Sequence, residues 1–464
     1  MRLAALLVVV ATLPLLAVAQ SPSVDDLIAR AKKRDAEAEY RLGLMTYEGR
    51  GVPRSPSQAR RLMERAAIRG HLDAQNTLGF FLQHGVGGAV NLEKAREWYE
   101  AAADRGHPLA QANAGWMAQE GLGGRQDAVA ALTWYRNAAA KGVIEADWNA
   151  ANLLERGGFG QLPDPDAAAE SYARTASRYP LAAFRLAQML EQKRIPPRQD
   201  GTALERYLQA AGAGIAQAQL AAGRLLLAAG KPADLPDAVQ WLAKALLAGQ
   251  PEAWKLLTDG AMQARIAGLA DRRETLAWLR PVAAQLAQSG IPEAQFAAGR
   301  LLLATNAPEA VKDAIPWLEA AAARGHGESR ALLADGETQY RIAGLLPAAE
   351  ALPWLRRAAG REQAKAMFAL AEALESGRGT TRNPAEAAQW YQKLAYAGSA
   401  EAHFRLGLMY DEGRGVPESP TRARDAFARA AELGHPEAKA RMARMLDGGF
   451  AKPPDFGDPF KGLR

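Results

Sequence analysis

The amino-acid sequence repeats itself with a period of about 36 residues, and this period limits the folds open to the chain. A short motif, A-x-x-x-[LA]-[GA], recurs at spacings of 36, 36, 36, 36, 36, 35, 41, 35, 37, 36 and 36 residues. Its copies, some with substitutions, begin at Ala38, Ala74, Ala110, Ala146, Ala182, Ala218, Ala253, Ala294, Ser329, Ala366, Ala402 and Ala438. Such periods are typical of repeat proteins, in which each unit completes its core against its neighbours. We therefore expect one small unit used about twelve times, rather than separate globular domains.

Each unit has the pattern of two helices. From Ala402 to Tyr410, small and apolar residues recur at helical spacing, and the glycine-rich segment 413–415 then ends the first helix. Ser419-Pro420 is a typical start for the second helix, because serine caps a helix and proline fits its first turn. Tryptophan also stands twelve residues before six of the motif copies, at Trp98, Trp134, Trp241, Trp317, Trp354 and Trp390.

The full pattern of these units resembles the Sel-1-like repeats, which are related to tetratricopeptide repeats. The pattern is A-x-x-x-L-G-x-x-Y-x-x-G-x-G-V, followed by A-x-x-W/L-x-x-K/R-A-A-x-x-G. Its best matches are residues 38–52, 74–87, 366–379 and 402–416, and the resemblance extends over roughly residues 24–446. The resemblance implies an all-α fold, a right-handed α-solenoid of about twelve helix–turn–helix repeats of ~36 residues.

The middle of the chain departs from the family pattern. Between residues 182 and 365 the G-x-G-V loop is missing, and alanine often replaces the motif glycine. Residues 221–228 recur at 297–304, an offset of 76 residues, which indicates that two adjacent units were duplicated together. We expect one repeat solenoid over residues 20–446, with a less regular middle at 182–365. The Gly- and Pro-rich residues 447–464 are expected to form a flexible tail.

The N-terminus has the pattern of a secretory signal peptide. Arg2 precedes an uncharged apolar run at residues 3–16, and Ala17-Val18-Ala19 is a typical cleavage site. The run is shorter than the ~20 residues that span a bilayer, and no cysteine follows it that could accept a lipid. We expect cleavage of residues 1–19, a periplasmic or secreted protein, and no membrane span in the mature chain.

The composition offers little catalytic chemistry. The chain has no cysteine, which excludes thiol nucleophiles, zinc–thiolate sites and disulfides. Its six histidines leave few residues for metal binding or acid–base catalysis. Four histidines follow a repeat glycine and are interpreted as parts of a turn; they are His71, His107, His326 and His435. Phosphate-loop and hydrolase motifs are also missing. We expect a protein that is not an enzyme and that has no cofactor and no catalytic or metal site. The chain has 57 basic and 51 acidic residues, and basic residues alternate with acidic ones along the second helices, which does not favour a nucleic-acid partner.

The variable positions of the first helices are the candidate binding residues, because the first helices of such solenoids usually line a concave groove. Offsets of three and six residues from the motif start supply aromatic, amide and arginine side chains, and aromatic residues and arginine often dominate interface energies. The candidates are Arg41, Phe80, Asn113, Trp116, Asn149, Asn152, Arg185 and Arg405. The resulting hypothesis is an exported scaffold that binds a protein or an extended peptide, in envelope assembly or exopolysaccharide secretion as the family resemblance implies.

Two alternatives remain open from the sequence. The tryptophan series could stack on sugars, which would make the protein a peptidoglycan or glycan binder, although packing between units explains the series as well. Some relatives of the family are β-lactam-binding hydrolases, but the cysteine pairs of those proteins are missing here.

Overall fold

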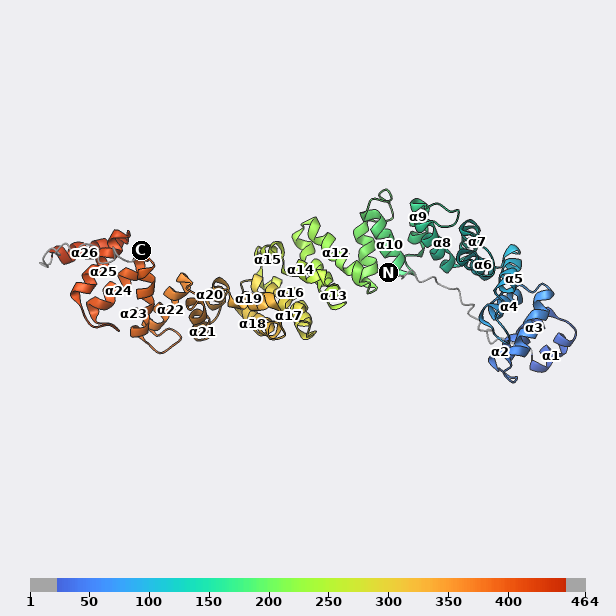
Figure 1. Ribbon diagram of the computed structural model, residues 1–464, viewed down its shortest axis with the longest axis horizontal. Helices are drawn as coiled ribbons and strands as arrows, with labels where there is room; N and C mark the ends of the chain where they lie inside the picture. Colours follow the sequence, from blue (N-terminus) through green and yellow to red (C-terminus); the bar gives the residue numbers. More distant parts are fainter. Residues whose placement is uncertain (1–22, 448–464) are drawn as a thin grey trace. The chain divides into compact units, whose positions relative to one another are not determined.

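The computed structural model describes residues 23–447, and these residues fold into helices joined by short turns (Figure 1). The signal peptide expected at residues 1–19 and the tail expected after residue 447 lie outside the described residues. The chain divides into two compact units, one ending at Leu225 and the other beginning at Leu226. The expectation of an all-α solenoid is confirmed, because within each unit consecutive helices pack in pairs and the pairs pack on their neighbours.

The first unit is a regular stack of helix pairs preceded by one helix. The odd-numbered helices from α3 to α11 are the second helices of their repeats. The helices are α1 (Val24–Lys32), α2 (Ala36–Glu48), α3 (Pro56–Ile68), α4 (Leu72–His84), α5 (Leu92–Asp104), α6 (Pro108–Glu120), α7 (Ala128–Ala140), α8 (Ile144–Arg156), α9 (Pro165–Thr175), α10 (Pro180–Glu191), α11 (Ala203–Gly212) and α12 (Ala216–Ala229), which extends past Leu225.

The second unit contains most of the less regular repeats, which begin at residue 182 in the first unit, and two regular repeats. A short 3₁₀ helix, η1 (Pro232–Asp234), precedes its α-helices. These are α13 (Leu235–Leu247), α14 (Glu252–Thr258), α15 (Gly260–Ala267), α16 (Arg272–Gln288), α17 (Pro292–Ala304), α18 (Pro308–Ala323), α19 (Gly327–Ala334), α20 (Gly336–Leu345), α21 (Ala348–Ala359), α22 (Ala364–Ser376), α23 (Pro384–Tyr396), α24 (Ala400–Glu412), α25 (Pro420–Glu432) and α26 (Pro436–Asp447).

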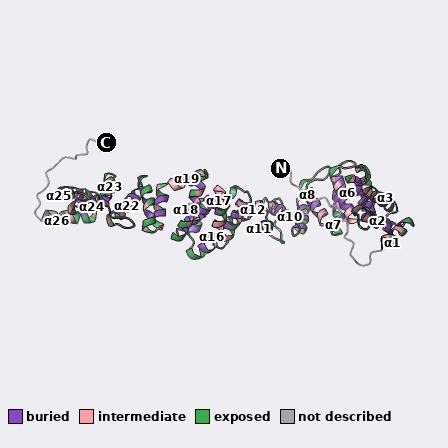
Figure 2. Cartoon of the chain, turned by 90° about the horizontal axis from the view of Figure 1, so that it is seen from below, coloured by how far each residue is buried: buried purple, intermediate pink, exposed green. Residues whose placement is uncertain are grey.

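The first residue of the motif is fully buried in every repeat. It is 0% exposed in all twelve copies, and the buried residues lie between the helices (Figure 2). Alanine suits this position because a small side chain lets two helices approach closely and has the best helix propensity. Ser329 is accommodated because its Oγ donates a hydrogen bond to the carbonyl oxygen of Leu318 at 2.7 Å.

The motif glycine makes room for an aromatic side chain of the second helix. At Gly79, a Cβ atom would lie 2.8 Å from the ring of Tyr99, which is 1% exposed. This tyrosine, rather than the preceding Trp98, fills the core of the repeat, and Trp98 is only half-buried. Equivalent tyrosines are fully buried at Tyr135, Tyr172 and Tyr391.

The G-x-G-V loop fastens one repeat to the preceding one. Gly87, with φ of +71°, lies so close to the start of α3 that a Cβ atom would be 2.3 Å from the carbonyl oxygen of Pro56. The loop therefore requires glycine for both its backbone conformation and its contact. The repeats between 182 and 365 lack this loop and with it this connection.

Two repeats depart from the expected pair of helices, because their first helix is broken in two. The breaks separate α14 from α15 at Asp259 and α19 from α20 at Asp335, which are 76 residues apart. Both aspartates have extended backbone, with ψ of 148° and 126°, and a glycine follows each. Aspartate favours helix starts over helix interiors, so each Asp-Gly pair begins a new helix. The expectation of two helices in every unit is wrong for these repeats.

Candidate functional site

Buried tyrosine hydroxyls hold the last turn of several first helices. Tyr135 of α7 donates a hydrogen bond from its Oη to Oε1 of Gln119 at 3.1 Å. The same contact, from the second helix to a residue 16 or 17 positions earlier, joins Tyr99 to Gln83, Tyr172 to Glu155, Tyr207 to Glu191 and Tyr391 to Glu375. Burial raises the pKa of Tyr135. These tyrosines are therefore neutral donors that fix the orientation of the side chains at the ends of the first helices.

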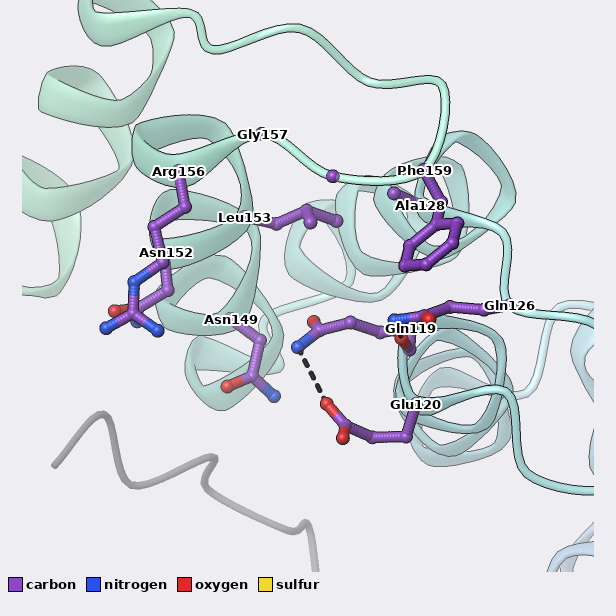
Figure 3. Close-up of a pocket in the computed structure, with 11 residues that line it drawn as sticks. Gln119, Glu120, Gln126, Ala128, Asn149, Asn152, Leu153, Arg156, Gly157 and Phe159 are labelled. Carbon is purple, nitrogen blue, oxygen red and sulfur yellow. Dashed lines mark hydrogen bonds between the residues drawn. The ribbon is translucent and has the colours of Figure 1, made fainter. Parts of the chain in front are cut away.

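One of these helix ends opens into a cavity of about 270 Å³ in the first unit. It lies between the C-terminal turns of α6 and α8, and its walls carry amide, charged and apolar groups (Figure 3). From α8, Asn149, Asn152 and Arg156 line it at positions i, i+3 and i+7, which share one face of a helix. The other lining residues are Gln119, Glu120, Gln126, Ala128, Leu153, Gly157, Gly158 and Phe159.

The loop after α8 forms one wall of this cavity. Gly158 and Gln161 exchange two backbone hydrogen bonds, of 2.8 and 2.6 Å, which fold residues 158–161 into a tight turn. The turn replaces the G-x-G-V loop of the regular repeats. It places Phe159 beside the cavity with 67% of its surface exposed, and Leu162 is 80% exposed. Exposed apolar side chains next to a polar pocket are typical of binding surfaces.

The polar groups of the cavity are held in place by neighbours. Asn152 donates from Nδ2 to the carbonyl oxygen of Trp148 at 2.8 Å, and Gln119 donates from Nε2 to Glu120 at 3.2 Å. Glu155 is already bound by Arg194 at 2.9 Å, and the adjacent Arg156 is exposed. The site therefore offers fixed amides, an exposed guanidinium group and an aromatic ring, which suit recognition of a polar chain better than bond cleavage.

The structure brings together Asn149 and Asn152 among the eight candidate groove residues. Asn149 is 3% exposed and Asn152 is half-buried. Asn113 lies deeper between repeats, where its Nδ2 donates to Oδ1 of Asn76 at 3.0 Å. Its exposure is 6%, which leaves it little surface for a partner.

The two candidate aromatic residues are half-buried. Phe80 lies against His84, with 4.5 Å between ring centroids, and contacts the core of the first three repeats. Trp116 packs between that core and the core of the following repeats. Each leaves part of its ring at the surface, so a role in partner binding stays a prediction.

The three candidate arginines lie far apart along the chain. Arg41 pairs with Glu37, and Arg405 makes ion pairs with Glu401 at 2.9 Å and Glu372 at 3.2 Å. Arg185 is half-buried on α10.

Sequence reasoning missed Gln119, Arg156 and Phe159. Gln119 and Arg156 lie in the last turns of α6 and α8, beyond offsets three and six of the motif. Phe159 lies in a loop whose Gly-Gly-Phe-Gly sequence departs from the family pattern, and that departure was the available signal.

The four turn histidines are helix caps, and His71, His107 and His435 also bond to a carboxylate of the preceding repeat. His107 accepts from the backbone N–H of Ala110 at Nδ1 (3.0 Å) and contacts Asp73 of the preceding repeat with Nε2 (3.0 Å). This hydrogen bond lowers the pKa of Asp73, although partial burial opposes the shift. His71 and His435 make the same pair of contacts. In the described part of the chain, no three His, Asp or Glu side chains are grouped so that they could hold a metal ion.

The tryptophan series does not present open ring faces at three of its six positions. A cation lies over the rings of Trp241, Trp354 and Trp390, at 4.4, 4.9 and 4.3 Å from the ring centroids. The cation belongs to the residue three positions later on the same helix in each case. Such capped faces argue against a sugar-stacking ladder.

Comparisons with known proteins agree with the repeat. The model of the Sel1 repeat matches residues 36–71, 72–107, 108–143, 214–250, 364–399 and 400–435. No curated protein sequence matches the chain significantly. Between residues 23 and 447, no helix is both long and apolar enough to cross a membrane.

Two of the solved structures that are similar to the chain are repeat proteins of this kind. One is a protective antigen of uropathogenic Escherichia coli strains, displaying an SLR fold, with 22% identity and a TM-score of 0.46. The match covers 94% of this chain and 100% of the antigen. The other is a Sel1 repeat protein from Oxalobacter formigenes, with 28% identity, a TM-score of 0.37, and coverage of 40% of this chain and 77% of that one. With six matches to the repeat model on an all-α solenoid of the same period, the chain is a Sel1-repeat protein.

Proposed function

We propose that the protein is a non-enzymatic scaffold that binds an extended segment of another protein at the cavity between α6 and α8. The observation that carries the proposal is the combination of this cavity with the exposed Phe159 at its rim. The exposed Arg156 guanidinium can donate to peptide C=O groups, the half-buried Asn152 amide lies beside it, and Phe159 provides an apolar anchor.

The position of the cavity favours an extended ligand. The cavity of about 270 Å³ adjoins the tight turn at residues 158–161, so one ligand can contact both. A peptide that inserts one side chain and continues along the exposed surface would use both the cavity and the loop. The exposed Leu162 extends the apolar part of this surface.

Substitutions at the rim of the cavity test this proposal. Peptides selected from a random library on the purified full chain should bind at least tenfold more weakly to Phe159→Ala and to Arg156→Ala, measured by calorimetry. Both side chains are exposed, so circular dichroism should show an unchanged fold. Tyr396→Ala, which removes a ring that is 72% exposed in the second unit, is the matched control. Unchanged affinity in both rim variants would place the binding site elsewhere, and turnover of a β-lactam or an ester would overturn the non-enzymatic role.

We propose further that the scaffold works outside the cytoplasm, in envelope assembly or exopolysaccharide secretion. The signal-peptide pattern of residues 1–19 supports export, and the resemblance to exported relatives supports the process. Mass spectrometry of the protein recovered from the periplasm should find a mature N-terminus at Gln20. An intact Met1 on the recovered protein would contradict cleavage.

A further inference from the structure

Four arginines of the second unit gather around an open cavity of about 640 Å³. Arg330 comes from α19, Arg356 and Arg357 come from the last turns of α21, and Arg361 follows that helix. The remaining lining residues are Ala322, Leu333, Ala334, Gln339 and Gly360. All charged side chains among these lining residues are therefore positive.

Among the described residues, Arg356 is the one of these four arginines that forms an ion pair. Arg356 forms an ion pair with Glu386, which lies outside the cavity. Arg330 donates from Nε to the carbonyl oxygen of Ala322 at 3.0 Å, and Arg357 lies 4.9 Å from the ring centroid of Trp354. Within residues 23–447, no ion pair joins Arg330, Arg357 or Arg361 to a carboxylate, and all three are exposed. A cavity with several unpaired guanidinium groups attracts anions, above all carboxylates that can bind two N–H donors at once.

A buried hydrogen-bond acceptor adds a second requirement on the ligand. Gln339 is 3% exposed, and its Nε2 donates to the carbonyl oxygen of Leu333 at 2.6 Å. Its Oε1 atom is buried and accepts no hydrogen bond from the described residues. Four other glutamines near the starts of first helices also have an unpaired Oε1, namely Gln75, Gln111, Gln219 and Gln295. Of these five glutamines, Gln339 is the one that lines this cavity. Because an unsatisfied buried carbonyl is unfavourable, a ligand with an N–H donor beside its anionic groups gains from pairing with it.

We propose that this cavity binds an acidic peptide segment of a partner protein. The carboxylates of the peptide pair with Arg330, Arg357 and Arg361, and one of its backbone N–H groups donates to Oε1 of Gln339. The apolar wall formed by Leu333 and the two alanines accepts the methylene groups of the peptide side chains. A peptide carries carboxylates and backbone N–H donors together. The charged phosphate groups of a nucleic acid offer hydrogen-bond acceptors but no donors. The site lies in the second unit and is separate from the cavity beside α8.

A charge-reversal series tests the inference. The probe is a fluorescent twelve-residue peptide of alternating glutamate and alanine, measured by anisotropy with the full chain. The double variant Arg330→Glu/Arg361→Glu should weaken binding more than tenfold, and Gln339→Leu should weaken it severalfold. Arg273→Glu, an exposed arginine of α16 outside the cavity, is the matched control and should change affinity less than twofold.

The outcomes separate the inference from its alternatives. A peptide in which glutamine replaces glutamate should not bind, and rising salt should weaken the acidic peptide. If the double variant does not fold, the single variant Arg361→Glu replaces it, because that side chain is exposed and has no partner among the described residues. Unchanged affinity in that variant overturns the site. Tighter binding of a polyuronate or of single-stranded DNA with the same dependence on Arg361 overturns the assignment to a peptide. Phe159→Ala should leave binding of the acidic peptide unchanged. A negative result at the arginine-lined cavity is therefore distinguishable from failure of the proposed function at the cavity between α6 and α8.

Discussion

At the scale of single residues, this protein depends on small side chains at positions where two repeats touch. Ala74 is 0% exposed between helices, and Gly87 meets the backbone of the preceding repeat. The sequence identified both positions by their period, but it gave no reason for the glycine beyond a turn. Glycine is required at position 87 because its backbone contacts the carbonyl oxygen of Pro56, 31 residues earlier. A residue that only ends a helix would not need this close contact.

A pair of glycine substitutions separates this contact from backbone conformation. Gly87→Ala and Gly142→Ala both force alanine into positive φ, at +71° and +87°. This conformation costs roughly 1–2 kcal/mol. Gly142 has open space where its Cβ would lie, whereas at Gly87 the Cβ would meet Pro56. We expect Gly87→Ala to lower the free energy of unfolding by ~1–3 kcal/mol more than Gly142→Ala does. The urea midpoint of Gly87→Ala should therefore be clearly the lower of the two. Equal midpoints would show that the loop can move away from Pro56.

At the scale of helices, the repeats differ in how their first helix is built. The sequence predicted one first helix in every unit, and its motif starts lie in helices throughout. It did not predict the breaks at Asp259 and Asp335, because a lone aspartate within a helical pattern is also compatible with a solvent-facing position. In the folded chain the Asp-Gly pair begins a new helix, and both pieces of the first break, α14 and α15, pack on α17.

The two breaks provide a matched pair for measuring a helix cap. Asp335 accepts a hydrogen bond from the backbone N–H of Thr338 at 2.7 Å, whereas α15 has no side-chain cap at Asp259. We expect Asp335→Ala to lower stability by about 1 kcal/mol, and Asp259→Ala to have a smaller effect. Thermal unfolding followed by circular dichroism measures both.

The pH dependence of the Asp335 cap has a definite sign. Backbone N–H donation from Thr338 lowers the pKa of Asp335 below its ordinary value of 3.8. The carboxylate therefore contributes stability above about pH 4, and this contribution is lost as the pH falls through the lowered pKa. The difference between the wild-type chain and Asp335→Ala should shrink at acid pH. A constant difference down to pH 2 would mean that the cap does not act through its charge.

At the scale of the whole molecule, stability should vary along the solenoid. Each repeat is held by its neighbours, so a repeat with short helices and no loop contact is held less firmly. The helices α14, α15 and α19 have 7, 8 and 8 residues, against 13 for α4 and α6. The regular repeats also have the G-x-G-V contact that these repeats lack.

Hydrogen exchange of the full chain tests this gradient. Backbone amides of α14, α15 and α19 should exchange at least tenfold faster than those of α4 and α6, as measured by mass spectrometry of peptic fragments. The expected reason is opening of the broken first helices without unfolding of the regular repeats. Uniform protection along the solenoid would show that the broken helices are as firmly packed as the continuous ones.

The sequence by itself determined the period, the helix pairs and the buried motif positions, because these follow from local propensities and from small residues at fixed spacing. It also directed attention to Asn149 and Asn152. Only the tertiary structure decided that Phe159 lies beside them, and that Arg330 shares a cavity with Arg361, 31 residues later. Cavities form where elements distant in the sequence meet, and their shape depends on loops and helix breaks that interrupt the repeat. A periodic sequence therefore specifies the scaffold, and its irregularities, once folded, create the candidate sites.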